Sequence, residues 1–301
     1  MLYSIDNNDD FSIGFVIYLP KKSFLDRIKT ATDSGCMVYI YDNSPKIGFV
    51  RDFCKKLPNC KYLTCGKNVG LGIGISSVCA QAFYDSHSVL LYFDQDTRFN
   101  IETINFIRNF YKSHLDLRSS YSAIIFNSKD FHKNDIGNKT DIKDVLFGIN
   151  SGSLFFLKNL EVINWHNTNY FVDCVDYEFC LNSNNHHFKI GEYSKTPGID
   201  HQKEQPDNIY KVFGKERLIR KYSRKRIFDY LFSSFRLISE SVRTMNFKYI
   251  KASVRSLLIY LYFQSIIRII KIYNCIISPR YWGRKFKFPA LGSRKNKVGE
   301  K

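Results

Sequence analysis

The stretch Val89–Arg98, VLLYFDQDTR, decides how the rest of the sequence is interpreted. Five apolar or aromatic residues run directly into Asp94 and Asp96. An uninterrupted apolar run predicts a strand buried on both faces, as in a parallel sheet covered by helices. Two carboxylates at the carboxyl end of such a strand lie where open α/β sheets bind ligands, and they can share one divalent cation. The alternative is a strand that ends in a solvated Asp-x-Asp turn.

Composition and charge divide the chain into two parts. Of 301 residues 44% are hydrophobic, with 26 Phe and 20 Tyr, so the chain can bury a core of one large or two ordinary domains. The net charge of +17 is uneven, because residues 1–202 carry −1 and residues 203–301 carry +18. We therefore expect a near-neutral folded domain over residues 1–205 and a basic region over residues 206–301 that meets an anionic partner.

The amino-terminal residues and the cysteines predict a cytoplasmic, reducing environment. Residues 1–10 are polar and acidic rather than basic and then apolar, so no signal peptide is expected. The eight cysteines form no C-x-x-C pair and lie mostly within apolar runs. We expect reduced core thiols rather than a zinc site or a disulfide framework.

Upstream of the acidic stretch the sequence predicts a strand, a helix and a second strand. The apolar run 11–19 ends at a proline, helical spacing follows from Phe24 to Ala31, and MVYIY at 37–41 forms the next strand. Asp42 follows that strand and therefore belongs to the same sheet edge as Asp94. An Asx-turn at the start of the loop is the alternative role for Asp42.

A glycine-rich segment follows the predicted third strand at 61–64. Gly70, Gly72 and Gly74 precede a helix that runs to Tyr84. Glycines let a backbone approach a ligand closely, and the free N–H groups of a helix start can bind phosphate. The segment matches neither the dinucleotide fingerprint nor the Walker A loop, so it is a weak phosphate motif by itself.

The central part of the chain adds two further polar groups. A helix at 101–111, a strand at 122–127 and a polar loop or flap at 128–144 precede Ser151-Gly152-Ser153, a segment typical of a tight bend or bulge. On a helix that begins near Asp173, Asp176 would share its face, three residues on. The alternative is that Asp173 caps that helix.

Five segments together resemble the family 2 inverting glycosyltransferases, especially their bacterial rhamnosyltransferase-like branch. The segments are IYLP at 17–20, YDNSP at 41–45, KNVGLGIG at 67–74, YFDQDT at 92–97 and FVDCVDYEFCL at 171–181. The resemblance covers about residues 11–222. Four positions depart from the family pattern: Leu19 replaces Asn, Gly72 replaces Ala, Asn182 replaces Arg, and the Gly three residues after His201 is missing.

The resemblance implies a GT-A fold, in which helices flank a mostly parallel central sheet, and a set of site residues. Asp176 would be the catalytic base, and Mg²⁺ or Mn²⁺ would be the cofactor. By the same resemblance Asp42 would contact the nucleotide base, and Asn68 and Gly70 would shape the nucleotide pocket. Asp94 and Asp96 would bind ribose and the metal-bound diphosphate. Ser151 and Gly152 would line the sugar and acceptor site, and His201 would lie near the metal or diphosphate.

The activity implied is transfer of a sugar, with rhamnose from dTDP-rhamnose as the first expectation, onto a lipid-linked surface-polysaccharide acceptor of the O-antigen or capsule type. A UDP-hexose or another nucleotide sugar is the alternative donor. Two alternatives of other classes stay open: a protein whose basic region follows a nucleic acid backbone, which we do not expect because no known reader motif occurs, and an inactive membrane adaptor.

The basic carboxyl-terminal region has the pattern of amphipathic helices. Residues 227–277 mix aromatic and aliphatic residues with Arg and Lys at helical intervals. The longest uncharged run, 256–267, has 12 residues and is too short to span a bilayer. We expect helices that lie on anionic lipid at the inner face of the cytoplasmic membrane. Packing on the folded domain with a solvated basic face is the alternative.

Overall fold

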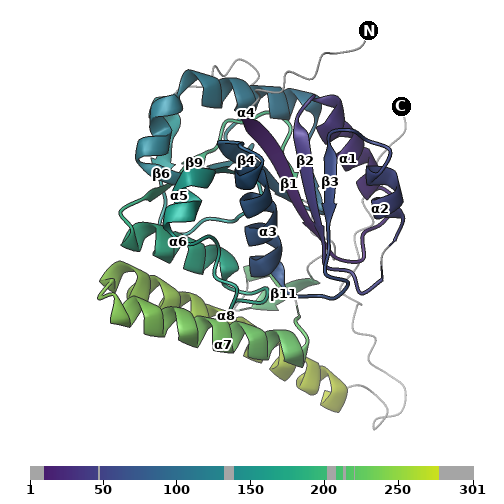
Figure 1. The fold of residues 1–301 in the computed structure, drawn as a ribbon. Coiled ribbons are helices and arrows are strands. Elements are labelled where there is room, and N and C mark those ends of the chain that lie inside the picture. The colour runs from purple at the N-terminus through teal and green to yellow at the C-terminus, as the bar shows by residue number, and fades with distance from the viewer. Residues whose placement is uncertain are drawn as a thin grey trace.

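The computed structural model describes residues 10–46, 48–131, 139–201, 208–212, 215–219 and 221–277. Its centre is an eight-stranded sheet flanked by helices, with strand order β3-β2-β1-β4-β8-β6-β9-β7 (Figure 1). The strands are β1 (Phe11–Ile17), β2 (Met37–Asp42), β3 (Cys60–Leu63), β4 (Val89–Asp94), β6 (Tyr121–Phe126), β7 (Lys143–Asp144), β8 (Ser153–Phe156) and β9 (Lys189–Tyr193).

The strands β3, β2, β1 and β4 are parallel neighbours, and only β8 and β7 oppose their pairing partners within the described sheet. The prediction of a mostly parallel α/β sheet flanked by helices is confirmed.

Two layers of helices explain why the central strands are apolar throughout. All seven residues of β1 and the first five of β4 are buried, because one core layer covers each face of the sheet. The helices of the first layer are α1 (Phe24–Asp33), α2 (Phe49–Cys54) and α4 (Ile101–Ser113). Those of the second are α3 (Leu71–Tyr84), α5 (Leu157–Val162) and α6 (Val175–Asn185).

The Ser-Gly-Ser segment is a turn at which the chain reverses direction. Gly152 has φ +81°, a conformation that favours glycine, and β8 leaves this turn antiparallel to β4 and β6. The predicted tight bend is therefore present. The cysteines whose side chains are described carry free thiols.

The start of α6 differs from the prediction. Cys174 has φ +63° and occupies the capping position, and the helix begins at Val175. Asp173 therefore lies before the helix and neither caps it nor shares its face with Asp176. A left-handed residue at Cys174 turns the chain away from the helical path, which the acidic spacing could not indicate.

The basic carboxyl-terminal region forms a short hairpin and two long helices. The elements are β11 (Asn208–Val212), β12 (Lys215–Ile219), α7 (Arg224–Arg243) and α8 (Phe247–Ile277), and a further small sheet pairs β5 (Thr97–Arg98) with β10 (Asp200–His201). The helices α7 and α8 lie side by side below the sheet domain (Figure 1).

Specific contacts attach the two helices to the sheet domain. The Tyr249 hydroxyl donates to the Cys180 carbonyl at 2.9 Å, and Arg226 pairs with Asp173 at 3.1 Å. Leu237 of α7 joins the core layer of α3, α5 and α6. Of the described helices, none combines the length and the apolar character that crossing a bilayer requires. The helices thus pack on the domain, and other faces of both remain exposed.

Candidate functional site

The carboxyl ends of β2, β1 and β4 bring the predicted acidic residues to one edge of the sheet. In the parallel register Ile17 pairs with Asp42, and Val16 pairs with Asp94. Asp42 and Asp94 therefore flank the end of β1, two strand spacings or about 10 Å apart. The prediction that both residues lie at the same sheet edge is confirmed.

Asp42 is buried, and two hydrogen bonds fix its carboxylate. Its Oδ1 accepts from the Ser44 N–H at 2.8 Å, and its Oδ2 accepts from the Tyr62 hydroxyl at 2.7 Å. The bond to Ser44 is the Asx-turn that the sequence offered as an alternative. Each carboxylate oxygen keeps a second lone pair, so the turn leaves Asp42 able to accept from a ligand.

Two asparagines tie the glycine-rich loop to the end of β2. The Asn68 Oδ1 accepts from the Gly70 N–H at 3.0 Å. Asn43 donates to the Gly70 carbonyl at 3.0 Å and accepts from the Val69 N–H at 3.2 Å. Asn43 was not predicted as a site residue, although it stands next to Asp42 and its type suits a loop clamp.

The glycines at the start of α3 make room for protein atoms. A Cβ on Gly70 would lie 2.6 Å from the Phe171 carbonyl oxygen, and one on Gly72 would lie 2.7 Å from that of Asn167. The Leu71 N–H donates to the same Phe171 carbonyl. The 167–171 loop therefore takes one N–H of this helix start, and phosphate binding by the helix start stays a prediction. A nucleotide contact at Gly70 stays a prediction.

Asp94 and Asp176 form the electrostatic centre of the site. Burial raises the pKa of Asp94 to about 6, and the charge of Asp96 adds to it. Burial raises the pKa of Asp176 to about 7, and the charge of Asp94 adds to it. The buried Tyr92 donates to Asp94 at 2.9 Å, and the charges of Asp94 and Asp176 both raise the pKa of its hydroxyl. The structure therefore brings together two acids that are 82 positions apart in the sequence.

One turn holds both acids in place. The Ser151 Oγ accepts from the Asp94 N–H at 3.0 Å, and the preceding N–H, of Asn150, donates to the Asp176 Oδ1 at 3.3 Å. The Gly152 N–H donates to the Tyr92 carbonyl at 2.8 Å. Ser151 and Gly152 thus join the turn to β4, and their contact with a sugar or acceptor stays a prediction.

A short strand pair extends the acidic stretch beyond Asp96. Thr97 pairs with His201 through β5 and β10, and its hydroxyl lies 2.7 Å from that of Ser151. The backbone of residue 201 is therefore beside the Asp-x-Asp motif. The side chain of His201 lies outside the described residues, so its role as a metal ligand stays a prediction.

His166, which was not predicted as a site residue, contacts the turn at Asn150. It is buried and stacks on Phe179 at 4.4 Å between ring centroids. Its Nε2 lies 3.3 Å from the Asn150 Oδ1, and burial lowers its pKa to about 3. The ring is therefore neutral at physiological pH. A histidine in a polar segment gave no signal of this role.

Two positions from the family pattern have structural contacts of their own. Asn182, which stands where the family has Arg, donates to the Ile163 carbonyl at 2.8 Å. Asp173 forms an ion pair with Arg226 and lies before the start of α6. Both side chains thus make polar contacts with other parts of the protein.

Asp94 and Asp96 fit a magnesium or manganese ion only together with a ligand. Among the residues that the structure describes, no three His, Cys, Asp or Glu side chains form a metal cluster. Mg²⁺ characteristically takes one or two carboxylates and completes its shell with water and phosphate oxygens. Two crowded carboxylates, one with a raised pKa, present negative charge that such an ion would neutralise.

Comparisons with known proteins gave only structural neighbours. No family model and no curated protein matches this chain. A crystal structure of S. aureus TarS has a TM-score of 0.46 at 16% identity, over 63% of this chain and 36% of that one. A structure of TarS residues 1–349 in complex with UDP has a TM-score of 0.44 at 14% identity, over 63% of this chain and 59% of that one. The same TarS segment in complex with UDP-GlcNAc has a TM-score of 0.44 at 15% identity, over 65% of this chain and 59% of that one. This chain therefore spans about one third to three fifths of the length of those chains.

Proposed function

We propose that this chain is an inverting glycosyltransferase that uses a nucleoside diphosphate sugar. One observation carries the proposal: Asp94 at the carboxyl edge of the sheet and Asp176 in the first turn of α6 contact the consecutive residues Ser151 and Asn150, and the charge of Asp94 acts on Asp176. The two acids stand in the motifs that resemble the donor and base motifs of family 2 glycosyltransferases. Their environments suit two different tasks.

Asp176 suits the role of base. A group that removes a proton at neutral pH works best with a pKa near 7, which is where burial and Asp94 place it. The Asn150 N–H fixes one carboxylate oxygen and leaves the other for the acceptor hydroxyl. That hydroxyl would lose its proton to Asp176 as its oxygen attacks the anomeric carbon. The bond from that carbon to the diphosphate oxygen breaks in the same step, and the anomeric configuration inverts.

Asp94 and Asp96 suit the leaving-group side. A bound Mg²⁺ or Mn²⁺ would neutralise the charge that develops on the departing diphosphate. Asp94 and Asp96 would hold the ion, and Asp42, Asn68 and Gly70 would bind the nucleoside. For the finer identity we propose dTDP-rhamnose as donor, with a UDP-hexose as the alternative, and a lipid-linked polysaccharide intermediate as acceptor.

An exposed row on α7 supports attachment to a membrane surface. Phe228, Phe232 and Phe235 are 58%, 71% and 60% exposed and share one face at helical spacing. The opposite face, with Leu237, is buried in the domain. Aromatic residues beside Arg and Lys are typical of helices that lie in the interface of an anionic bilayer. We propose peripheral binding to the inner face of the cytoplasmic membrane.

Thermal shift with a panel of nucleotide sugars tests the function. With Mg²⁺ or Mn²⁺ present, we expect one donor to raise the melting temperature and Asp96→Ala to abolish that rise. The matched control Asp33→Asn, an exposed carboxylate at the end of α1, should leave it intact. Asp176→Asn should keep donor binding and lose transfer. If no nucleotide sugar changes the melting temperature and the protein binds DNA tightly, a nucleic-acid-binding function is favoured instead.

A further inference from the structure

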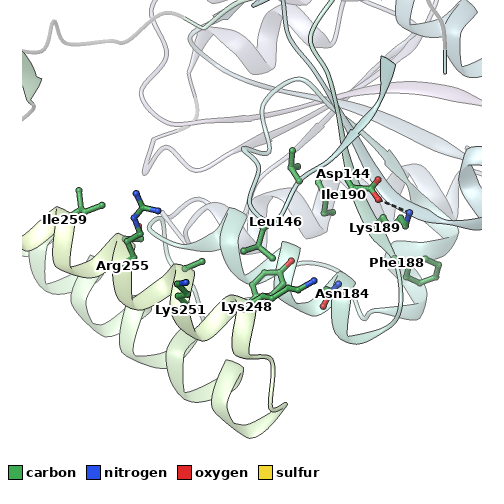
Figure 2. Close-up of a pocket in the computed structure, with 14 residues that line it drawn as sticks. Asp144, Leu146, Asn184, Phe188, Lys189, Ile190, Lys248, Lys251, Arg255 and Ile259 are labelled. Atoms are coloured by element: carbon green, nitrogen blue, oxygen red, sulfur yellow. Dashed lines mark ion pairs between the residues drawn. The ribbon is translucent and has the colours of Figure 1, made fainter. Parts of the chain in front are cut away.

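A cavity of about 850 Å³ lies between α8 and the sheet domain, outside the acidic site. Lys248, Lys251 and Arg255 line it from α8 at spacings of three and four residues, which places them on one helix face. Leu146 and Ile190 line the opposite wall from the sheet domain (Figure 2). The cavity therefore has three cations on the α8 side, and on the other side apolar side chains beside the paired Asp144 and Lys189.

The cations of this wall are available to a ligand. Lys248, Lys251 and Arg255 are exposed and have no hydrogen bond or ion pair with any residue in the described part of the chain. The acid of the cavity, Asp144, is already paired with Lys189 at 2.8 Å. An occupant that satisfies three uncompensated positive charges is anionic.

The cavity is connected to the proposed base by two elements. Asn184 at the end of α6 lines the cavity, and Asp176 lies eight residues earlier on the same helix, about 12 Å away along its axis. Leu146 lines the cavity as well, and four residues later Asn150 donates to Asp176. The cavity and the proposed base thus lie about 12 Å apart along α6.

We propose that this cavity binds the phosphate-bearing head of an anionic lipid. Lys251 and Arg255 hold the phosphate, and the first methylenes of the lipid lie against Leu146, Ile190 and Ile259. The role of this lipid as acceptor rests on the proposed function, because a sugar linked through the phosphate would then extend toward Asp176. The binding itself requires no donor and no turnover.

Calorimetric titration of the full chain without any nucleotide sugar tests the site. The probe is dihexanoyl phosphatidic acid below its micelle-forming concentration. We expect the double variant Lys251→Ala/Arg255→Ala to lose at least about tenfold in affinity, since two charge-assisted contacts disappear. The matched control Arg224→Ala/Lys225→Ala removes two exposed cations of α7 outside the cavity and should stay within about twofold of the parent.

Shorter and simpler probes test the apolar wall. Each methylene that the wall buries strengthens binding about fourfold, so dibutanoyl phosphatidic acid and inorganic phosphate should bind progressively more weakly. Equal affinity for phosphate and lipid, or equal loss in both double variants, would overturn the proposal. Circular dichroism verifies that the variants are folded. Asp176→Asn should bind the lipid as the parent does although it loses transfer, so failure of the proposed activity and failure of this site are read separately.

Discussion

Replacing Asp176 by asparagine should stabilise the protein while it abolishes transfer. The pKa of Asp176 is about 7 in the folded chain, against an ordinary value of about 3.9 when unfolded. The folded state therefore retains a proton that the unfolded state releases between pH 4 and 7. Stability that depends on this proton is present at low pH and is lost as pH rises through 7. The variant carries no such group and avoids the loss.

The size of the effect follows from the difference in pKa. Three pKa units correspond to about 4 kcal/mol when the group is fully ionised. Asp176 keeps partial contact with solvent, so we reduce this to about 2 kcal/mol. The asparagine Oδ1 can still accept from the Asn150 N–H, and no new unsatisfied donor need arise. For a chain of this size we expect a melting temperature about 4 °C higher.

Calorimetric melting curves from pH 4 to pH 8 test this expectation. The gap between Asp176→Asn and the parent should be near zero at pH 4 and should grow until about pH 7. The exposed control Asp33→Asn should differ from the parent by less than about 0.5 kcal/mol at every pH. Two results would contradict the raised pKa of Asp176. One is a melting temperature of Asp176→Asn at or below that of the parent at pH 8. The other is a difference in melting temperature that stays the same at every pH.

Further predictions concern the acid pair, the helix start and the α7 surface. Asp94→Asn removes a charge that raises the pKa of Asp176, so a carbon-13 titration of Asp176 should move to lower pH, and an upward shift would contradict the pairing. Gly70→Ala should cost about 2 kcal/mol more than Gly66→Ala in urea denaturation, because both have positive φ but only Gly70 meets protein atoms; equal costs would remove the packing role. The triple change to serine at Phe228, Phe232 and Phe235 should abolish flotation with anionic liposomes, since each exposed ring contributes about 1 kcal/mol or more. Tyr84→Ser, a change at an 85% exposed aromatic residue elsewhere, should float as the parent does, and loss in both variants would point to a general effect.

The sequence allowed the sheet edge to be predicted because strand ends are local features. Continuous apolar runs mark buried strands, and polar residues directly after them mark the carboxyl ends. Parallel pairing then brings Asp42 and Asp94 to the same edge whatever the detailed register. Asp176 needed the resemblance as well, because the spacing of Asp173 and Asp176 fitted either a shared helix face or a helix capped by Asp173.

The remaining features depend on tertiary contacts that spacing does not contain. The left-handed Cys174 delays the start of α6, and the Phe171 carbonyl accepts from the N–H of Leu71, 100 positions away in the sequence. The cavity lies between α8 and the sheet domain, where Tyr249 of that helix donates to the Cys180 carbonyl. Predicting these features would require the contacts between segments that are far apart in the sequence.

The consecutive anchors at Asn150 and Ser151 have a consequence for the geometry of the acid pair. Asn150 donates to Asp176 and Ser151 accepts from Asp94, so displacement of this turn moves the contacts of both acids together. Two partly buried carboxylates repel each other, and the turn contacts both β4 and α6, the elements that carry them. The turn therefore links the proposed base to the strand that carries the diphosphate side. The chain reverses at Gly152, with φ +81°, directly after Asn150, which donates to the Asp176 carboxylate, and Ser151, which accepts from the Asp94 N–H.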